Sequence, residues 1–135
     1  MSIFYKDGYN YQLKQDYLIN TGLNLSVDLC GDYLELYKGG LLVIKKGYAW
    51  DGATCAIDTN NFMRGSLVHD AMYQLIRDGA IDKKHRVYAD KLLHKILLED
   101  GMSKFRAGYV YLAVKQFGAP HADPAKDHPL LQAPK

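Results

Sequence analysis

The sequence predicts an α+β fold, in which an N-terminal antiparallel β-sheet is followed by three α-helices and an extended, proline-rich C-terminal tail. Residues 3–46 consist of short runs rich in tyrosine, leucine and valine that glycines interrupt, a pattern typical of strands and turns. From residue 58 to residue 118 the apolar residues recur at the three-and-four spacing of helices. All four prolines lie between residues 120 and 134, where they exclude helix and central strand.

The length of 135 residues is that of one domain with a real hydrophobic core. We expect this domain to cover residues 1–118, β-rich over 1–50 and helical over 58–118. The remaining residues, 119–135, are expected to be extended or disordered, either as a frayed end or as an arm that packs on a neighbouring subunit.

The composition is that of a folded globular protein, and it disfavours nucleic acid as a partner. A net charge of +2 with dispersed basic residues argues against nucleic-acid binding. No apolar run is long enough to cross a bilayer, and the N-terminus shows no apolar segment of a signal peptide.

For Cys30 and Cys55, two free thiols in a reducing cytoplasm are favoured over one bridge.

One hairpin is predicted most clearly in the β-rich part. Along residues 33–38, two tyrosines and a glutamate at odd positions alternate with two leucines and a lysine at even positions. The apolar run 41–44 then follows the pair Gly39 and Gly40. Such runs on both sides of a glycine turn indicate two antiparallel strands joined about Gly39.

Three helices are expected, each with a capping residue at its start and a glycine after its end. In chain order they are 60–77, capped by Asp58 or Thr59 and closed by Gly79; 82–101, capped by Asp82 and ending at Gly101; and 103–118, capped by Ser103 and ending at Gly118.

The first helix places a histidine on the face that should be buried. Spacing of three and four puts His69 in one stripe, which consists of Phe62, Ser66, His69, Tyr73 and Ile76. Asp70 lies about 100° further round, at the edge of this face.

The second helix places a carboxylate in its apolar stripe, which consists of Val87, Asp90, Leu93 and Leu97. A buried carboxylate without a partner costs several kcal/mol, so Asp90 needs one. The link 78–81 is short, and helices so joined are normally antiparallel neighbours. This brings His69, in the middle of the first helix, opposite Asp90.

An imidazole held in this way has chemical consequences. His69 paired with Asp90 has one tautomer, and its other nitrogen can take a proton from water. Tyr73 could donate its hydroxyl to the same carboxylate. Asp70 would remain for a cation, together with Asp51 in its glycine-containing turn. Oxygen ligands of this kind suit Ca²⁺ better than zinc, and the cation could stabilise developing negative charge.

Simpler interpretations stay open. His69 could be an ordinary core histidine, Asp90 could pair with Arg86 one turn earlier, and Asp51 could cap a turn. A further alternative is a transition-metal site built from His69, Asp70, Asp90 and His94.

Four motifs carry a resemblance to a known family. They are DGAT at 51–54, HDAMY at 69–73, RVYAD at 86–90 and YLAVKQFG at 111–118. Together they make the segment 48–118 resemble an uncharacterised phage and prophage family, known as domain of unknown function thirteen-fifty-three. Departures from its pattern occur at Thr54, Ala56, Met72 and Lys115. The resemblance implies a phage origin, synthesis in the host bacterial cytoplasm and association with the virion.

The order HDxxY on one helix and AD on the next is also similar to secreted and parvoviral phospholipase A-two enzymes. This similarity implies that His69 is a general base, Asp70 a calcium ligand and Asp90 the residue that orients His69, with Tyr73 as its hydrogen-bond partner. The turn at Asp51 departs from the glycine-rich calcium loop of those enzymes.

Two functions from different classes follow. The first is a small phage-encoded hydrolase, dependent on calcium and acting on lipid or another envelope ester when the phage enters or lyses its host. The second is a non-enzymatic virion or assembly protein, in which the polar residues lock two helices and 119–135 bind a neighbouring subunit or another virion protein.

Overall fold

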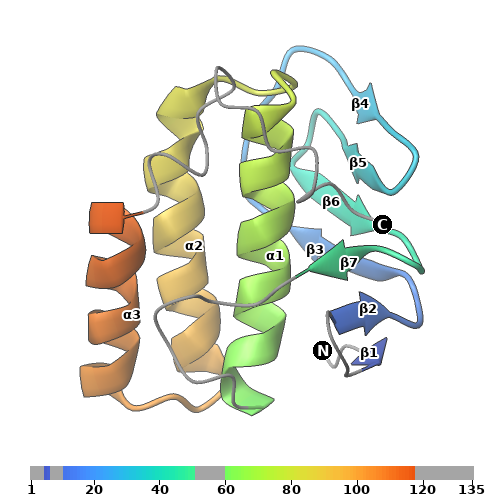
Figure 1. Ribbon diagram of the computed structural model, residues 1–135. Coiled ribbons are helices and arrows are strands. Elements are labelled where there is room, and N and C mark those ends of the chain that lie inside the picture. The colour runs from blue at the N-terminus through green and yellow to red at the C-terminus, as the bar shows by residue number, and fades with distance from the viewer. Residues whose placement is uncertain (1–4, 7–10, 51–59, 118–135) are drawn as a thin grey trace. The chain divides into compact units, whose positions relative to one another are not determined.

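The computed structural model describes residues 5–6, 11–50 and 60–117. These residues fall in two compact units, a β unit before residue 51 and a helical unit over 60–117, which are described separately below. Antiparallel strands followed by three helices confirm the predicted fold class (Figure 1). The predicted tail, 119–135, lies outside the described residues, and the single domain over 1–118 stays a prediction.

The described part of the β unit contains two antiparallel sheets. The first has the order β1 (Tyr5–Lys6), β2 (Tyr11–Leu13), β7 (Ala49–Trp50), and the second has the order β3 (Tyr17–Asn20), β6 (Leu41–Ile44), β5 (Leu34–Leu36), β4 (Leu29–Cys30). Cys30 is an exposed free thiol, and Cys55 lies outside the described residues.

Strands β5 and β6 form the predicted hairpin. Leu36 pairs with Leu42, and the turn closes where the Gly40 amide donates to the Tyr37 carbonyl at 2.8 Å. Gly40 has a φ of 96°, and a Cβ there would lie 2.7 Å from the carbonyl oxygen of Leu23, so this position requires glycine. Alternate residues of both strands form the core of this sheet, namely Leu34, Leu36, Leu42 and Ile44.

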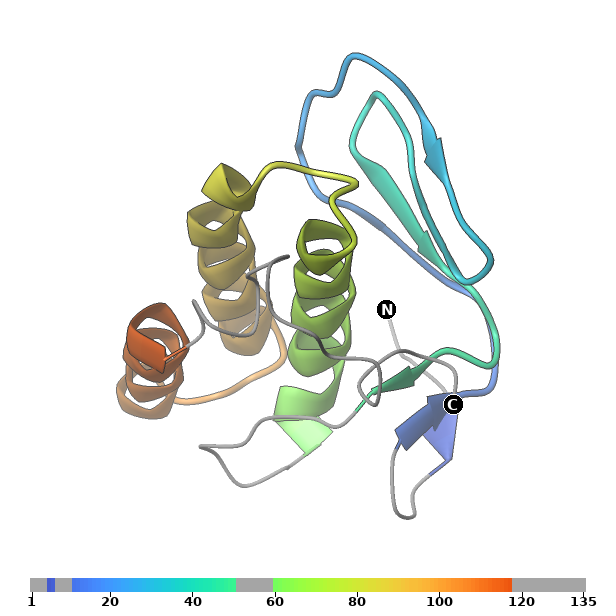
Figure 2. The same ribbon diagram turned by 45° about the horizontal axis from the view of Figure 1, so that its top comes forward.

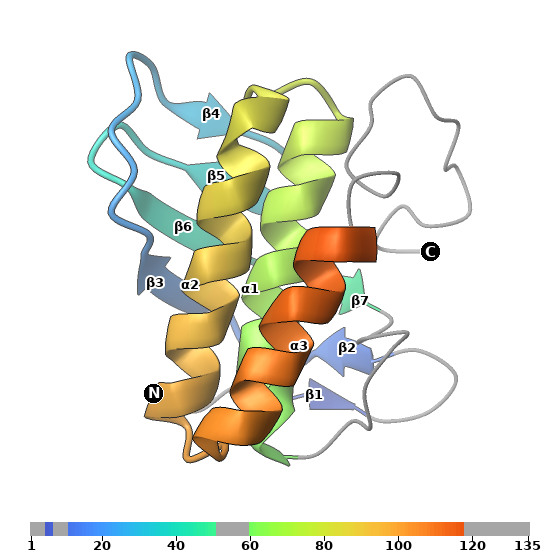
Figure 3. The same cartoon turned by 90° about the vertical axis from the view of Figure 1, so that its left-hand side faces the viewer.

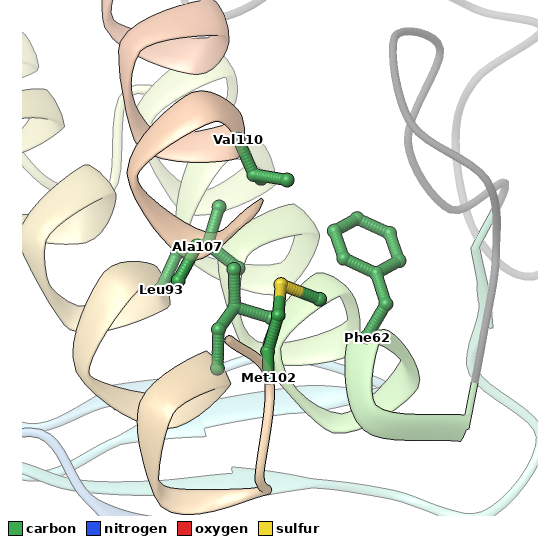
Figure 4. Close-up of a cluster of buried hydrophobic side chains, with 6 residues drawn as sticks. Phe62, Leu93, Met102, Ala107 and Val110 are labelled. Carbon is green, nitrogen blue, oxygen red and sulfur yellow. The ribbon is translucent and has the colours of Figure 1, made fainter. Parts of the chain in front are cut away.

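The helical unit consists of α1 (Asn60–Arg77), the 3₁₀-helix η1 (Lys83–His85), α2 (Arg86–Glu99) and α3 (Lys104–Phe117). In three views the helices lie side by side, and α2 packs against both α1 and α3 (Figures 1, 2 and 3). Their inner side chains meet in one cluster, Phe62, Leu93, Leu97, Met102, Ala107 and Val110 (Figure 4). None of the helices in the described part of the chain combines the length and apolar character needed to span a membrane.

The capping residues mark the ends of helical segments, although the second α-helix is shorter than predicted, Arg86–Glu99 in place of 82–101. Asp82 accepts a hydrogen bond from the Lys84 amide at 2.8 Å, but it starts η1, so α2 begins four residues later than the cap. Ser103 accepts from the Arg106 amide at 3.2 Å and caps α3. Positive φ angles of 77° at Gly79 and 91° at Gly101 confirm both closing glycines. The positions 58–59 and Gly118 lie outside the described residues.

One of the two predicted helix faces needs correction. The α1 stripe is buried as predicted, and almost all other residues from Phe62 to Ile76 are buried as well. On α2, Val87 is wrongly placed in the buried stripe, because 47% of it is exposed. The buried face of α2 is centred on Leu93, and Val87 lies about 120° from that centre at 100° per residue.

A small residue sets how closely α1 and α2 approach. A Cβ at Gly65 would lie 2.9 Å from Cδ1 of Leu93 and 3.0 Å from Cδ2 of Leu97. Gly65 is one turn before His69 on the same side of α1. The close packing at Gly65 therefore also determines how near His69 comes to α2.

Candidate functional site

Helices α1 and α2 run antiparallel, and polar contacts mark their pairing. Near the start of α1, the buried Arg64 binds the end of α2: Nη2 lies 2.9 Å from Oε1 of Glu99 and from Oδ1 of Asp100, and Nε donates to both Asp100 oxygens. The other ends of the helices are joined by residues 78–82 and η1. This arrangement places the middles of the two helices opposite each other.

His69 and Asp90 meet there, as predicted. Nε2 of His69 lies 2.7 Å from Oδ1 of Asp90, and the exposed fractions are 8% for His69 and 1% for Asp90. Tyr73, one turn after His69, donates its hydroxyl to the same oxygen at 2.6 Å. The two rings lie together, with centroids 4.1 Å apart, because residues four apart share a helix face.

Arg86 completes this group from the first turn of α2. Its Nη1 lies 3.6 Å from Oδ2 of Asp90 and donates to the carbonyl of Lys115 on α3 at 3.1 Å. The sequence left pairing with His69 and pairing with Arg86 as alternatives, and both occur, since they use different oxygens of one carboxylate. We refer to His69, Tyr73, Arg86 and Asp90 as the Asp90 cluster.

Proton positions in the Asp90 cluster follow from its geometry. Burial raises the pKa of Tyr73, and its hydrogen bond to Asp90 raises it further, while Arg86 acts in the opposite direction. Tyr73 therefore keeps its proton and donates a hydrogen bond to Asp90. A carboxylate can only accept a hydrogen bond, so Nε2 of His69 is the nitrogen that donates to Asp90, and Nδ1 is the ring nitrogen that does not contact Asp90.

Only one of the two predicted metal ligands lies within the described residues. Asp70 follows His69 on α1 and is partly buried, whereas Asp51 and its turn lie outside the described residues. Over 5–6, 11–50 and 60–117, no three His, Cys, Asp or Glu residues are grouped to hold a metal. The alternative site with His94 is thus not formed, and the His94 ring packs on Tyr111, with centroids 5.3 Å apart.

Sequence reasoning missed Arg64. Its side chain is 4% exposed and bound by two acidic residues, which join the first turns of α1 to the end of α2. The signal was an arginine in an apolar helical segment, which needs an acidic partner when buried. The acidic pair Glu99 and Asp100 stands where an antiparallel second helix would end, so the pairing could have been predicted.

Comparison with known proteins identifies the family. A family model described as "Protein of unknown function (DUF1353)" matches residues 32–114, more than half of the chain. The chain belongs to this family. The match confirms the family indicated by the motifs, although it begins before the predicted segment 48–118, and it contains the β5–β6 hairpin and the whole Asp90 cluster. Neither a curated protein nor a solved structure matched the chain.

Proposed function

We propose that this chain is a small hydrolase in which His69 acts as general base and Asp90 orients it. The observation that carries the proposal is the contact of 2.7 Å between Nε2 of His69 and Oδ1 of Asp90. Tyr73 and Arg86 hold the carboxylate from two further directions. A histidine fixed in one tautomer by a buried acid is a common arrangement in general-base catalysis.

The proposed chemistry uses Nδ1, the ring nitrogen of His69 that does not contact Asp90. Nδ1 of His69 takes a proton from water as the water oxygen bonds to an ester carbonyl carbon. The carbonyl carbon then releases the alcohol oxygen, and the imidazolium returns the proton to this leaving group. Asp90 stabilises the positive charge that His69 carries between the two steps, and Tyr73 keeps the Asp90 oxygen in place.

For the cation we propose Ca²⁺, with Asp70 and Asp51 as its carboxylate ligands. Calcium would polarise the ester carbonyl and offset charge on its oxygen. Within the described residues only Asp70 supports this part of the proposal, through its position next to His69 on α1. The proposed substrate is a lipid or another ester of the bacterial envelope, used when a phage enters or lyses its host, because the HDxxY and AD motifs are similar to those of phospholipases A-two.

Burial of the Asp90 cluster favours a second candidate, a non-enzymatic virion or assembly protein. Asp90 is 1% exposed and Tyr73 3%, and the cluster joins α1, α2 and the end of α3. Buried polar groups can specify helix packing without chemistry. In this candidate the residues 119–135 contact a neighbouring subunit or another virion protein.

The test compares the wild type with a variant that keeps the contact with Asp90 but lacks the general base. In His69→Gln the amide nitrogen can still donate to Asp90, whereas no basic nitrogen remains. His94→Gln is the matched control, since His94 lies on α2 outside the Asp90 cluster. Hydrolysis of phospholipid vesicles and of simple aryl esters is measured with calcium and with a chelator, and circular dichroism checks folding.

The hydrolase predicts activity in the wild type and in His94→Gln, and its loss in folded His69→Gln. Loss of activity with the chelator would support Ca²⁺ specifically. If wild type and His69→Gln hydrolyse nothing above background with or without calcium, the hydrolase is excluded. The assembly protein then predicts that His69→Gln, which keeps the contact with Asp90, still complements particle formation, whereas folded His69→Ala, which loses the contact, does not.

A further inference from the structure

Helix α3 exposes an apolar stripe that its own unit leaves uncovered. Phe105 is 87% exposed, Tyr109 57% and Leu112 60%. Their spacing of four and three places them on one face. The opposite face supplies Ala107 and Val110 to the helical core, so α3 is apolar on two sides.

Positive charge borders the exposed stripe. The α3 segment contains no aspartate or glutamate, and its basic residues are Lys104, Arg106 and Lys115. At 100° per residue, Lys104 and Lys115 lie about 80–100° from Phe105 on one side, and Arg106 lies about 100° on the other. Lys104 and Lys115 are exposed. The outer face of α3 is therefore apolar in the middle and basic at both borders.

The charges distinguish between possible occupants of this face. In a two-fold pair of α3 helices, the basic borders would face each other with no acidic residue on α3 to offset them. A neutral apolar partner would leave the lysines without a complement. An anionic lipid surface offers both chemistries, acyl chains for the stripe and phosphate groups for the borders.

We propose that α3 is an interfacial helix that binds an anionic phospholipid surface. Phe105 and Leu112 enter the boundary between headgroups and acyl chains, and the Tyr109 ring lies with its hydroxyl toward the headgroups. Lys104 and Lys115 extend along the surface to the phosphates. The inference does not rest on the proposed hydrolysis, because an inert protein with this helix would bind in the same way.

The test measures sedimentation of the full chain with sucrose-loaded vesicles. One set is phosphatidylcholine alone, and the other contains phosphatidylglycerol as well. The wild type is compared with Phe105→Ser/Leu112→Ser and with Lys104→Gln/Lys115→Gln. The control is Leu18→Ser/Val27→Ser, which removes two exposed apolar side chains of the β unit, with exposed fractions of 55% and 56%.

We expect binding to the phosphatidylglycerol vesicles only, weakened by added salt. The Phe105→Ser/Leu112→Ser affinity should fall at least tenfold, and the two-lysine variant should lose about fivefold for each charge. The control should bind like the wild type. His69→Gln should also bind normally, which separates this inference from the hydrolase.

Three outcomes would overturn the proposal. The first is no binding, or equal binding to both vesicle types. The second is binding that both α3 variants retain. The third is a wild type that does not bind vesicles but forms a dimer in sedimentation velocity, when the Phe105→Ser/Leu112→Ser variant is a monomer. The exposed face of α3 would then be occupied by a second copy of the chain. Circular dichroism and thermal unfolding of each variant establish that the altered chains are folded.

Discussion

The hydroxyl of Tyr73 lies 2.6 Å from Oδ1 of Asp90 and donates to it, and the same oxygen lies 2.7 Å from Nε2 of His69. Two successive turns of α1 therefore converge on one atom of α2. Because Asp90 is buried, each of these donors offsets part of the cost of removing its carboxylate from water. Loss of either donor should lower the free energy of unfolding, and loss of the Tyr73 hydroxyl should also change the position of the His69 ring.

Tyr73→Phe should destabilise the helical unit. The variant keeps the ring contact with His69 but removes one of the donors to Asp90, which should cost about 1–3 kcal/mol. Urea denaturation measures the free energy of unfolding. The control Tyr109→Phe removes an exposed hydroxyl and should change it by less than about 0.5 kcal/mol. Equal effects would show that the Tyr73 bond contributes nothing.

Stability should also decrease in alkali because of Tyr73. Its pKa is raised in the folded chain, first by burial and then by Asp90, whereas an unfolded tyrosine ionises near pH 10.0. The contribution is complete below pH 10 and is lost as the pH rises from there toward the folded pKa.

The measurement is urea denaturation between pH 8 and pH 11. The wild type should lose stability above pH 10 more steeply than Tyr73→Phe. Tyr37, whose pKa the hydrogen bond to Glu35 raises to about 12, is present in both proteins, so their difference isolates Tyr73. Parallel curves for the two proteins would contradict the prediction.

Arg64 should be replaceable by neither lysine nor alanine. Its guanidinium binds Asp100 through two nitrogens and Glu99 through one, a geometry that a single ammonium cannot reproduce. We expect Arg64→Lys to cost about 1–2 kcal/mol and Arg64→Ala more, since the buried stem is lost as well. Thermal unfolding at low and high salt checks this order. A fully stable Arg64→Ala protein would show that the pairing is dispensable.

Alanine should have opposite effects at two helical glycines. At Gly108 nothing lies within 4 Å of a new Cβ, so Gly108→Ala should stabilise the protein by about 0.5–1 kcal/mol through helix propensity. At Gly65 the Cβ would contact Leu93 and Leu97, and the strain of about 1–3 kcal/mol should exceed that gain. Chemical denaturation of both variants measures the contrast. Equal stabilisation would mean that α2 moves away from α1 without cost.

The sequence predicted features that depend on neighbouring residues in the chain. The β5–β6 hairpin needs glycine at residue 40 for its turn, and the 60–77 helix needs periodic apolar residues and a closing glycine. The contact of His69 with Asp90 was also predictable, because two helices joined by a connection as short as 78–81 normally pack antiparallel. Its chemical role stays a prediction, as do the calcium ligands Asp70 and Asp51.

By itself, the sequence determined that a β-rich part precedes three helices and that Asp90 needs a partner, since the first follows from backbone preferences and the second from the cost of a buried charge. Only the tertiary structure decided which groups share that carboxylate, because His69, Tyr73 and Arg86 could each reach it and sequence spacing does not distinguish its two oxygens. It also decided that Val87 faces solvent, because the direction of a helix face depends on where its neighbours pack.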